Sequence, residues 1–561
     1  MLAAAGGVLW GLSFAREPLG VASWLTLAPL ILLLAHPRAG RLAFLHGLAA
    51  WLTGLYWIVP TLITYGGLPP AAAAALTTLL AAFLALFHGA FGWLGGPLWR
   101  AAAGRLAKGE KYALAVRLFG LPALWVALEW LRTYFLGGFP WNLAAYAWIG
   151  VAGALPLAAW IGAYGVSFLV VWVAVGLAAT VERLSRTSRG AGRRSRHWRH
   201  SRQAANGSGS KAREGRTPEA YAKYVEGVRP SATPETGPFP APRPRRWWVP
   251  LGAGLAVPLL LLPLAGRWSG RLAARENARV GQAGLPVRIL QPNIANLVGW
   301  DPAAVMRNYR KVVDLSYSYC QPGVLVIWPE SAAWPFVYGR DAVLDQDLRA
   351  MSDRGCTVLL NSSSPAGDSF YNSAFLLAPA SPPERYDKRH LVPFGEYVPF
   401  KDVFFFLKKL ARNAGDFRPA DRLVLLPWRG EKLGAAICYE VVFPEEVALL
   451  TRAGATLLAT ITNDAWYGDT AAPWQHLRAA RFRAAENRRT MLRAAITGVS
   501  ALIAPDGSVP AKLGVGEEGV IRAQVAGETL LTPYARRPWL PPLACTAAAA
   551  AFVVYCSWRR S

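Results

Sequence analysis

A chain of 561 residues is too long for one ordinary domain, because a domain has about 150 residues. The composition, with 53% hydrophobic residues, 24 Trp and a mean hydropathy of +0.24, excludes an ordinary soluble globule and predicts a membrane protein. Nearly half of the formal charge of +26 lies in one segment, because residues 183–246 contain 16 Lys and Arg but only 4 Asp and Glu. Such a basic segment indicates the membrane topology of the chain more directly than it indicates an acidic ligand.

Apolar runs that can cross a bilayer fill most of the first 266 residues, and one more lies near the C-terminus. About 20 helical residues span the ~30 Å hydrocarbon core. We therefore expect a polytopic α-helical membrane domain of about eight transmembrane helices, six of them within residues 1–182. The first run lacks a basic leader segment, so we expect a helix there and not a cleaved signal peptide. The expected helices cover residues 2–15, 20–36, 42–64, 70–98, 114–135, 155–181, 247–266 and 537–556.

The loops between these runs alternate in charge. Residues 36–41, 100–117 and 183–246 are basic, whereas residues 65–68 and 136–139 carry no charge. Basic loops lie on the cytoplasmic side of a membrane. Seven crossings from a cytoplasmic N-terminus then place the following region on the other side, and the eighth helix returns the chain. We expect the region between the last two helices to be extracytoplasmic.

The basic segment 183–246 is rich in Arg, Ser and Gly at first and in Pro later. It has too few apolar side chains to offset the entropy cost of ordering, so we expect a disordered cytoplasmic loop. Its charge would be attracted to anionic lipid headgroups. No aromatic interleaving or binding motif accompanies the charge, so we expect a tether and no nucleic-acid partner.

The pattern changes after residue 284 from long spans to short strands that alternate with helical stretches. Several strands are apolar throughout, as expected for strands buried on both faces. This alternation predicts a layered α/β domain over residues 284–530, with helices over 302–319 and 474–495. The expected strands cover residues 287–291, 324–328, 357–361, 373–377, 423–427, 433–439, 456–462 and 498–503.

Three segments of this domain carry reactive side chains at the ends of strands. Residues 324–330 form a strand that ends in Pro-Glu, residues 386–396 form a loop with Lys388, and a third strand ends at Cys438. Catalytic groups collect where strands end and loops begin. Each segment taken singly is ordinary, because a Cys after an apolar run is usually packed and inert, and a single Glu or Lys is usually a surface charge.

Glu330, Lys388 and Cys438 together supply what thiol catalysis needs. A thiol attacks an ester or amide carbonyl as its thiolate, so a nearby carboxylate must take the proton. An ammonium group stabilises both the thiolate and the oxyanion that follows. The five Cys of the chain show no spacing typical of a zinc site or of a disulfide framework. We expect neither a metal nor a cofactor.

The three motifs, in this order, resemble the Glu-Lys-Cys signature of the nitrilase (carbon-nitrogen hydrolase) superfamily. They are strand-Pro-Glu330, Asp-Lys388-x-His-Leu-Val-Pro-Phe-Gly-Glu396 and Ile-Cys438-Tyr-Glu440. The resemblance implies an extracytoplasmic α-β-β-α sandwich. It also implies that Glu330 is the general base, Cys438 the nucleophile and Lys388 part of the oxyanion hole, together with a backbone N–H near the Cys.

Further segments narrow the resemblance. Residues 291–294 (Gln-Pro-Asn-Ile), 300–302 (Trp-Asp-Pro), 462–468 (Thr-Asn-Asp-Ala-Trp-Tyr-Gly) and 474–476 (Trp-Gln-His), in a domain flanked by spans, are similar to the apolipoprotein N-acyltransferase family. The similarity covers almost the whole chain, and the insert 183–246 departs from it. It implies a monomeric, multi-pass protein of the bacterial inner membrane, with its catalytic domain on the periplasmic side.

The reaction implied by the resemblance is a ping-pong transfer. Cys438 attacks the sn-1 ester of a phospholipid donor, releases a lysophospholipid and holds the acyl chain as a thioester. The acceptor is the α-amino group of the S-diacylglyceryl cysteine of an apolipoprotein. Both substrates carry acyl chains, and moving these into water costs roughly 0.8 kcal/mol per CH₂, so the thiol is expected close to the lipid bilayer.

Family matching adds Glu396, Tyr439 and Glu440 as active-site support and Trp300 as a wall of the substrate pocket. Core packing is an equal alternative for the two aromatic residues, since aromatic side chains dominate core contacts. For Glu440 the alternative is a carboxylate at a helix N-terminus.

The aromatic run Phe404, Phe405 and Phe406 follows the Glu396 loop closely. It could dip into the membrane interface as a lid over the site. A helix packed on the domain core is the equal alternative, because aromatic residues at helical spacing usually mark a core face.

Two other functions remain open at this point. A membrane-tethered amidase would share the three reactive residues, release the acyl group to water and need only one span. A transporter or scaffold with a degenerate domain would need intramembrane charges along a path, and Glu129 and Arg132 are almost the only candidates. Cys320 and Cys356 could pair on an oxidising side, but nothing in the sequence shows that they are close.

Overall fold

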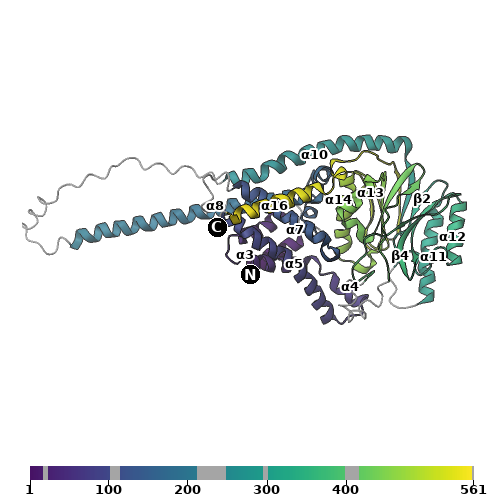
Figure 1. The fold of residues 1–561 in the computed structure, drawn as a ribbon, viewed down its shortest axis with the longest axis horizontal. Coiled ribbons are helices and arrows are strands. Elements are labelled where there is room, and N and C mark those ends of the chain that lie inside the picture. The colour runs from purple at the N-terminus through teal and green to yellow at the C-terminus, as the bar shows by residue number, and fades with distance from the viewer. Residues whose placement is uncertain (17–22, 102–113, 212–247, 295–300, 398–415, 559–561) are drawn as a thin grey trace, which may run out of the picture.

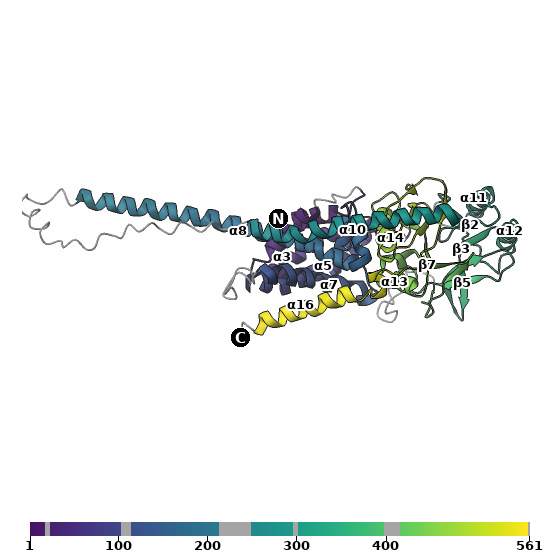
Figure 2. The same ribbon diagram turned by 90° about the horizontal axis from the view of Figure 1, so that it is seen from above.

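The structure, a computed structural model, describes the chain except for residues 17–22, 102–113, 212–247, 295–300, 398–415 and 559–561. The α/β domain forms one end of the described part, the apolar helices form a bundle next to it, and the C-terminal part of the helix Ala154–Lys211 projects from the far side of the bundle (Figure 1). The first helix and the end of the last helix both lie in the bundle, away from the sheets (Figure 2). The elements of the bundle are α1 (Leu2–Leu12), α2 (Ser23–Leu33), α3 (Ala39–Gly54), α4 (Ile58–Thr64), α5 (Pro70–Ala101), η2 (Val116–Gly120), α7 (Leu121–Tyr134), η3 (Phe135–Gly137), η4 (Ala144–Trp148), α8 (Ala154–Lys211), α10 (Trp248–Ala283) and α16 (Leu540–Trp558).

Three helices in the described ranges are long and apolar enough to cross a membrane: Pro70–Arg100, Ala154–Ser185 and Trp248–Leu272. α3 and α4 pass this test only as a pair, with a bend of 52° between them. The expected continuous helix over 42–64 is therefore broken, because Pro60 fits only the first turn of a new helix. α1 and α16 are apolar but shorter. The count of eight crossings stays a prediction.

α8 and α10 are both longer than the apolar runs that predict them. α8 continues to Lys211, so residues 183–211 are helical where we expected a disordered loop. Arg and Ala have high helix propensity, and extending an existing helix avoids the cost of nucleation. The rest of the predicted loop lies outside the described residues. α10 extends past residue 266 to Ala283 and leads directly into the first strand.

The α/β domain contains two six-stranded sheets, in the strand orders β12-β1-β2-β3-β4-β5 and β11-β10-β9-β8-β7-β6. In each sheet the three central strands are parallel (β1, β2, β3 and β7, β8, β9) and the outer strands are antiparallel. The elements are β1 (Leu285–Gln291), α11 (Pro302–Tyr319), β2 (Leu325–Ile327), α12 (Ala342–Asp353), β3 (Thr357–Ala366), β4 (Ser369–Leu377), β5 (Glu384–Asp387), β6 (Leu426–Trp428), β7 (Glu431–Ile437), η6 (Cys438–Val442), α13 (Pro444–Arg452), β8 (Leu457–Thr462), η7 (Asp464–Tyr467), α14 (Ala472–Asn487), β9 (Met491–Ala495), β10 (Ser500–Ile503), β11 (Ala511–Leu513), β12 (Gly519–Val525) and α15 (Pro533–Arg536).

Alternating side chains explain why the central strands are apolar throughout. Leu325 and Ile327 of β2 pack in the core between the two sheets, whereas Val326 packs in a separate core that also contains buried residues of α11 and α12. On the other sheet, Ile437 faces the core between the sheets and Ala436 faces the core that contains residues of α14. The layers are therefore helix, sheet, sheet and helix, and the predicted two-sheet fold is confirmed.

One predicted helix was too long. We expected helix over 474–495, but α14 ends at Asn487 and residues Met491–Ala495 form the buried strand β9. The helix stops at Arg488, whose φ of 49° is left-handed. The sequence has no Gly or Pro at this point, so no local signal marks the boundary.

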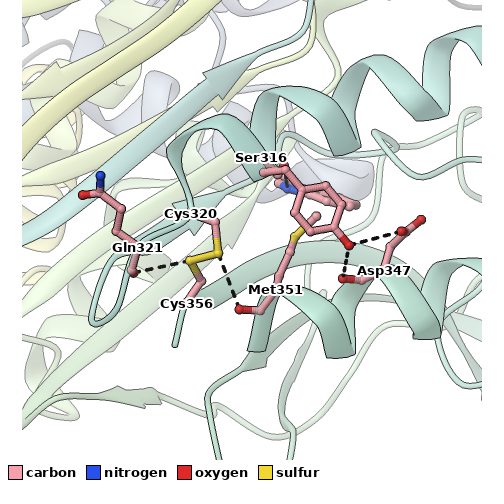
Figure 3. Close-up of a disulfide and its surroundings, with 8 residues drawn as sticks. Ser316, Cys320, Gln321, Asp347, Met351 and Cys356 are labelled. Atoms are coloured by element: carbon pink, nitrogen blue, oxygen red, sulfur yellow. Dashed lines mark hydrogen bonds between the residues drawn. A yellow bond between two sulfur atoms is a disulfide. The ribbon is translucent and has the colours of Figure 1, made fainter. Parts of the chain in front are cut away.

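Cys320 and Cys356 form a disulfide, with their Cα atoms 5.6 Å apart (Figure 3). Cys320 directly follows α11 and Cys356 directly precedes β3. The bond therefore ties the end of an outer helix to the start of a central strand. The sequence left this pairing open, because it does not show how close two distant residues lie.

Candidate active site

The three reactive residues predicted from the sequence lie at the ends of three strands. Glu330 follows β2, Lys388 follows β5 and Cys438 follows β7. The first two strands belong to one sheet and the third to the other, so the site lies at one edge of the sandwich, across both sheets. Lys388 Nζ is 3.8 Å from Glu330 Oε1, and both groups influence the ionisation of the Cys438 thiol. The structure thus brings the three side chains together.

Lys388 is held by Glu396, which the sequence predicted as a supporting residue. Its Nζ lies 3.0 Å from Oε1 and 2.9 Å from Oε2 of Glu396, and the Lys388 side chain is 1% exposed. Burial lowers the pKa of Lys388, but the carboxylates of Glu396 and Glu330 raise it more, so the net shift is upward. Lys388 is therefore a permanent cation. We call Glu330, Lys388 and Glu396 the lysine network.

Asn372 on β4 joins the two carboxylates of this network, and sequence reasoning missed it. Its Nδ2 donates to Glu330 Oε1 at 3.0 Å and to Glu396 Oε1 at 2.7 Å. Glu330 Oε2 also accepts from the backbone N–H of Asn463 at 2.9 Å. Asn361 Nδ2 donates to Asn372 Oδ1 at 2.6 Å, which turns the amide so that its NH₂ group faces the carboxylates.

Cys438 is a free thiol at the first residue of η6. Its φ of 52° lies in the left-handed region, which residues other than Gly adopt rarely and often at functional sites. Burial raises the pKa of the thiol, Glu330 raises it further and Lys388 opposes both, with a net shift far upward. The resting sulfur is therefore a neutral thiol.

Glu440 connects the Cys438 turn to the Lys388 loop. Its Oε2 accepts from the backbone N–H of Ile437 at 2.7 Å. Its Oε1 accepts from Tyr386 Oη at 2.8 Å and from the backbone N–H of Arg389 at 2.7 Å. The buried carboxylate therefore fixes the residues on both sides of Lys388 against those on both sides of Cys438.

A second buried network lies behind Cys438. His476 Nε2 donates to the backbone carbonyl of Cys438 at 3.1 Å, and its Nδ1 lies 3.0 Å from Asp464 Oδ1. Arg493 Nη2 donates to Asp464 Oδ2 at 2.6 Å. Burial raises the pKa of Asp464, but Arg493 and His476 lower it more, so the net shift is downward. We call Asp464, His476 and Arg493 the histidine network; it holds the Cys438 backbone, and its Asp464 also raises the pKa of the thiol, though less than Glu330 does.

The site faces the helical bundle. Tyr439 Oη donates to the backbone carbonyl of Gly138, just after η3, at 3.0 Å. His390 Nε2 lies 3.1 Å from the carbonyl oxygen of Gly137, and Nδ1 lies 2.8 Å from Glu446 Oε1 on α13. Because both partners accept, the imidazolium form, which donates from both ring nitrogens, fits this position best, and these partners raise the pKa of His390.

Gln475, next to the histidine of the second network, makes another contact with the bundle. It accepts from Trp57 Nε1 at 3.1 Å and from Trp141 Nε1 at 2.6 Å. It donates to the backbone carbonyls of Phe14 at 2.9 Å and Gly54 at 3.1 Å. α14 is therefore fixed between the sheet and the bundle, and with it the support behind Cys438.

Four predicted site residues, Trp300 and Phe404 to Phe406, lie outside the described residues. Their roles as pocket wall and lid stay predictions. Within the described ranges, no group of three or more His, Cys, Asp or Glu side chains is arranged to hold a metal ion.

Comparison with known proteins addresses both parts of the chain. A family model described as the apolipoprotein N-acyltransferase N-terminal domain matches residues 6–176, and one described as carbon-nitrogen hydrolase matches residues 286–532. The apolipoprotein N-acyltransferase of Geobacter metallireducens is 31% identical and covers 95% of this chain and 91% of its own length. The chain belongs to the apolipoprotein N-acyltransferase family. This membership confirms the resemblance seen in the sequence.

Two further comparisons describe the extent of the likeness. The apolipoprotein N-acyltransferase of Ralstonia nicotianae is 32% identical and covers 97% of this chain and 90% of its own. A solved CN-hydrolase superfamily protein from Xanthomonas campestris covers 46% of this chain and 96% of its own, with 18% identity and a TM-score of 0.34.

Proposed function

We propose that this chain transfers an acyl chain from a phospholipid to the α-amino group of an S-diacylglyceryl cysteine on an apolipoprotein. The observation that carries the proposal is the free, buried Cys438, held beside Glu330 and Lys388 and next to a turn of the helical bundle. Family membership over nearly the full length favours this reaction over a membrane-tethered amidase or a transporter.

In the first half-reaction the Cys438 sulfur attacks the sn-1 ester carbonyl of the phospholipid. Because the raised pKa of Cys438 keeps the resting thiol neutral, Glu330 takes the proton as the S–C bond forms. Lys388 and the backbone N–H that follows the Cys stabilise the oxyanion. When the ester C–O bond breaks, Glu330 returns the proton to the glycerol oxygen and a lysophospholipid leaves.

In the second half-reaction the α-amino group of the apolipoprotein attacks the thioester carbonyl. Glu330 takes one proton from the amine, the C–S bond breaks, and the proton passes to the sulfur. The products are an amide and the regenerated thiol. Glu330 and Cys438 are 7% and 9% exposed, and this burial protects the thioester from water between the two steps.

Four residues act through these three in the proposed mechanism. Glu396 and Asn372 fix Lys388 and Glu330, Glu440 fixes the two catalytic loops, and Tyr439 fixes the Cys turn to the bundle. Trp300 and the run 404–406 would line and cover the acyl chain.

We place the catalytic domain, residues 284–530, on the extracytoplasmic face of the bacterial inner membrane, in a monomer with about eight crossings. The charge alternation of the loops supports this side. The disulfide between Cys320 and Cys356 also supports it, because such bonds persist in oxidising compartments.

The test is an acyl adduct on Cys438. Purified chain is incubated with phosphatidylethanolamine that carries a radiolabelled sn-1 acyl chain, and hydroxylamine-labile label on the protein is counted. The wild type and Cys545→Ala, which removes another free thiol, should carry the label, and Cys438→Ala should not. A diacylglyceryl peptide with a free amine should then take the label. Label on Cys438→Ala, or release as free fatty acid in place of transfer, would reject the proposal.

A further inference from the structure

A basin lies beside α10, where the chain passes between the bundle and the α/β domain. Its volume is about 360 Å³, which falls in the range of roughly 300–1,000 Å³ that is usual for small-molecule sites. None of its lining residues belongs to the lysine network or the histidine network. We call it the α10 basin, and it is lined by Leu272, Arg275, Arg488, Pro505, Glu528, Thr529 and Leu530.

The α10 basin lies at the level where the membrane should end. The apolar span of α10, Trp248–Leu272, ends at a residue that lines the basin. Within its last turns, the Trp268 ring contacts the ring of Trp160 on α8 at 5.3 Å between centroids, and Trp160 is 47% exposed. Trp side chains gather where the headgroups of a bilayer meet the acyl chains. The Arg488 guanidinium lies 4.9 Å from the Trp268 centroid, which connects this aromatic level to the basin.

The lining of the basin contains both charged and apolar side chains. These side chains can contact the charged headgroup of a lipid and the carbons next to it. Arg275 is exposed on α10, and Arg488 is half-buried at the end of α14. Guanidinium groups match phosphate oxygens in geometry as well as charge. Glu528 lines the same basin and supplies a partner for an ammonium group. Leu530 of the lining is 70% exposed, which is unfavourable in water but suits contact with the acyl carbons of a lipid.

We propose that the α10 basin binds the headgroup of a zwitterionic phospholipid, with its phosphate at Arg275 and Arg488 and its ammonium group at Glu528. This inference rests on the membrane placement given with the proposed function. A lipid bound here holds the α/β domain at the bilayer surface and keeps a phospholipid, the class of the proposed donor, on the same face of the membrane as Cys438.

The experiment measures lipid binding to the full chain in detergent by native mass spectrometry. The probes are phosphatidylethanolamine and phosphatidylglycerol, with inorganic phosphate as a competitor. Arg275→Glu should weaken binding of both lipids roughly ten- to a hundredfold, the loss expected for one charge-assisted contact to phosphate. The matched control is Arg271→Glu, on the same helix, equally exposed and outside the basin lining, which should bind both lipids as the wild type does. Glu528→Gln should weaken only phosphatidylethanolamine.

Three results would overturn the inference. They are unchanged binding by Arg275→Glu, an equal loss in Arg271→Glu, and full displacement of the lipid by millimolar inorganic phosphate, which would show a phosphate site without lipid recognition. Unchanged phosphatidylethanolamine binding by Glu528→Gln would overturn the ammonium assignment. Acyl-adduct formation by the wild type is measured in parallel with a soluble short-chain ester. A wild type that binds lipid at the basin but forms no adduct would reject the proposed function and leave the basin standing.

Discussion

Two buried charge networks lie next to Cys438, and they act on this residue in different ways. Glu330 and Lys388 of the lysine network affect the pKa of the Cys438 thiol more than Asp464 of the histidine network does, whereas His476 donates to the backbone carbonyl of Cys438. Both are almost fully buried and both pair a cation with a carboxylate. Burial and charge pairing therefore do not distinguish a reacting group from a supporting one. The size of the effect on the pKa of the Cys438 thiol does differ between the networks, and isosteric changes in each network test whether that difference matters for activity.

The largest loss of activity is expected for Glu330→Gln. The amide oxygen can accept from only one of the two donors that Glu330 satisfies, the Asn463 N–H or the Asn372 amide, but Lys388 stays paired with Glu396, so the loss of stability should be small. It cannot take a proton from the thiol, so acyl-adduct formation should fall roughly 10²- to 10⁴-fold. Pre-steady-state labelling and thermal unfolding in detergent measure the two effects. A loss of stability that matches the loss of rate would place Glu330 among the supporting residues.

Asp464→Asn is the matched change in the histidine network. It should lower stability strongly and the rate of adduct formation only a little. It removes the charge that pairs with Arg493 at 2.6 Å and leaves a buried cation without compensation, so unfolding should become easier by about 3 kcal/mol. The rate of adduct formation per folded molecule should fall far less than in Glu330→Gln. An activity loss as large as that of Glu330→Gln at wild-type stability would contradict the division between the networks.

The sequence points to the lysine network and to Cys438 because these residues end strands or follow them in short motifs. Glu330, Lys388, Glu396 and Cys438 all lie in such segments. Asn372 was missed because its role depends on the fold. The pairing of β3 with β4 places its amide between two carboxylates. No local pattern around an Asn within a strand carries that information.

The histidine network was missed as a unit for a related reason. Asp464 and His476 lie in segments that the sequence analysis singled out, but Arg493 lies on a strand that we predicted to be helix. The three meet only because α14 packs on η6 and β9 brings Arg493 to Asp464 at the start of η7. Composition alone also does not decide where a helix ends. For this reason the sequence did not predict the break between α3 and α4 or the helical extension of α8.

Asn372 tests how much the positioning of the lysine network contributes to the rate, because it holds two carboxylates of that network and cannot itself accept a proton from the thiol. Asn372→Ala removes the donor shared by Glu330 and Glu396, and the maximal rate of adduct formation should fall about tenfold, the worth of one buried hydrogen bond to charged groups. Asn372→Asp keeps the shape but adds a third carboxylate, so its loss should be larger. The KM for the soluble ester should stay unchanged in both. A pure KM effect would indicate that Asn372 contacts substrate and is not a positioning residue.

The smallest effect on stability is expected at His390, which belongs to neither network and contacts the helical bundle. Burial lowers the pKa of His390, but its bonds to Glu446 and Gly137 and the nearby Glu440 raise it more, so the net shift is upward. A raised folded pKa means that this contact stabilises the fold in full below the unfolded value of 6.5 and is lost as pH rises through the folded value.

His390→Gln should therefore lower stability by about 1 kcal/mol at pH 6, with a gap to the wild type that narrows as pH rises. Thermal unfolding of both chains from pH 5.5 to 9 measures the gap, and Glu446→Gln is the control because it removes the facing carboxylate. The other charged group that faces His390 is Glu440, whose buried bonds to Ile437 and Arg389 are unchanged in both variants. A gap that widens with pH would show that the neutral imidazole makes this contact, and the bundle would then be joined to the catalytic turn without a charge.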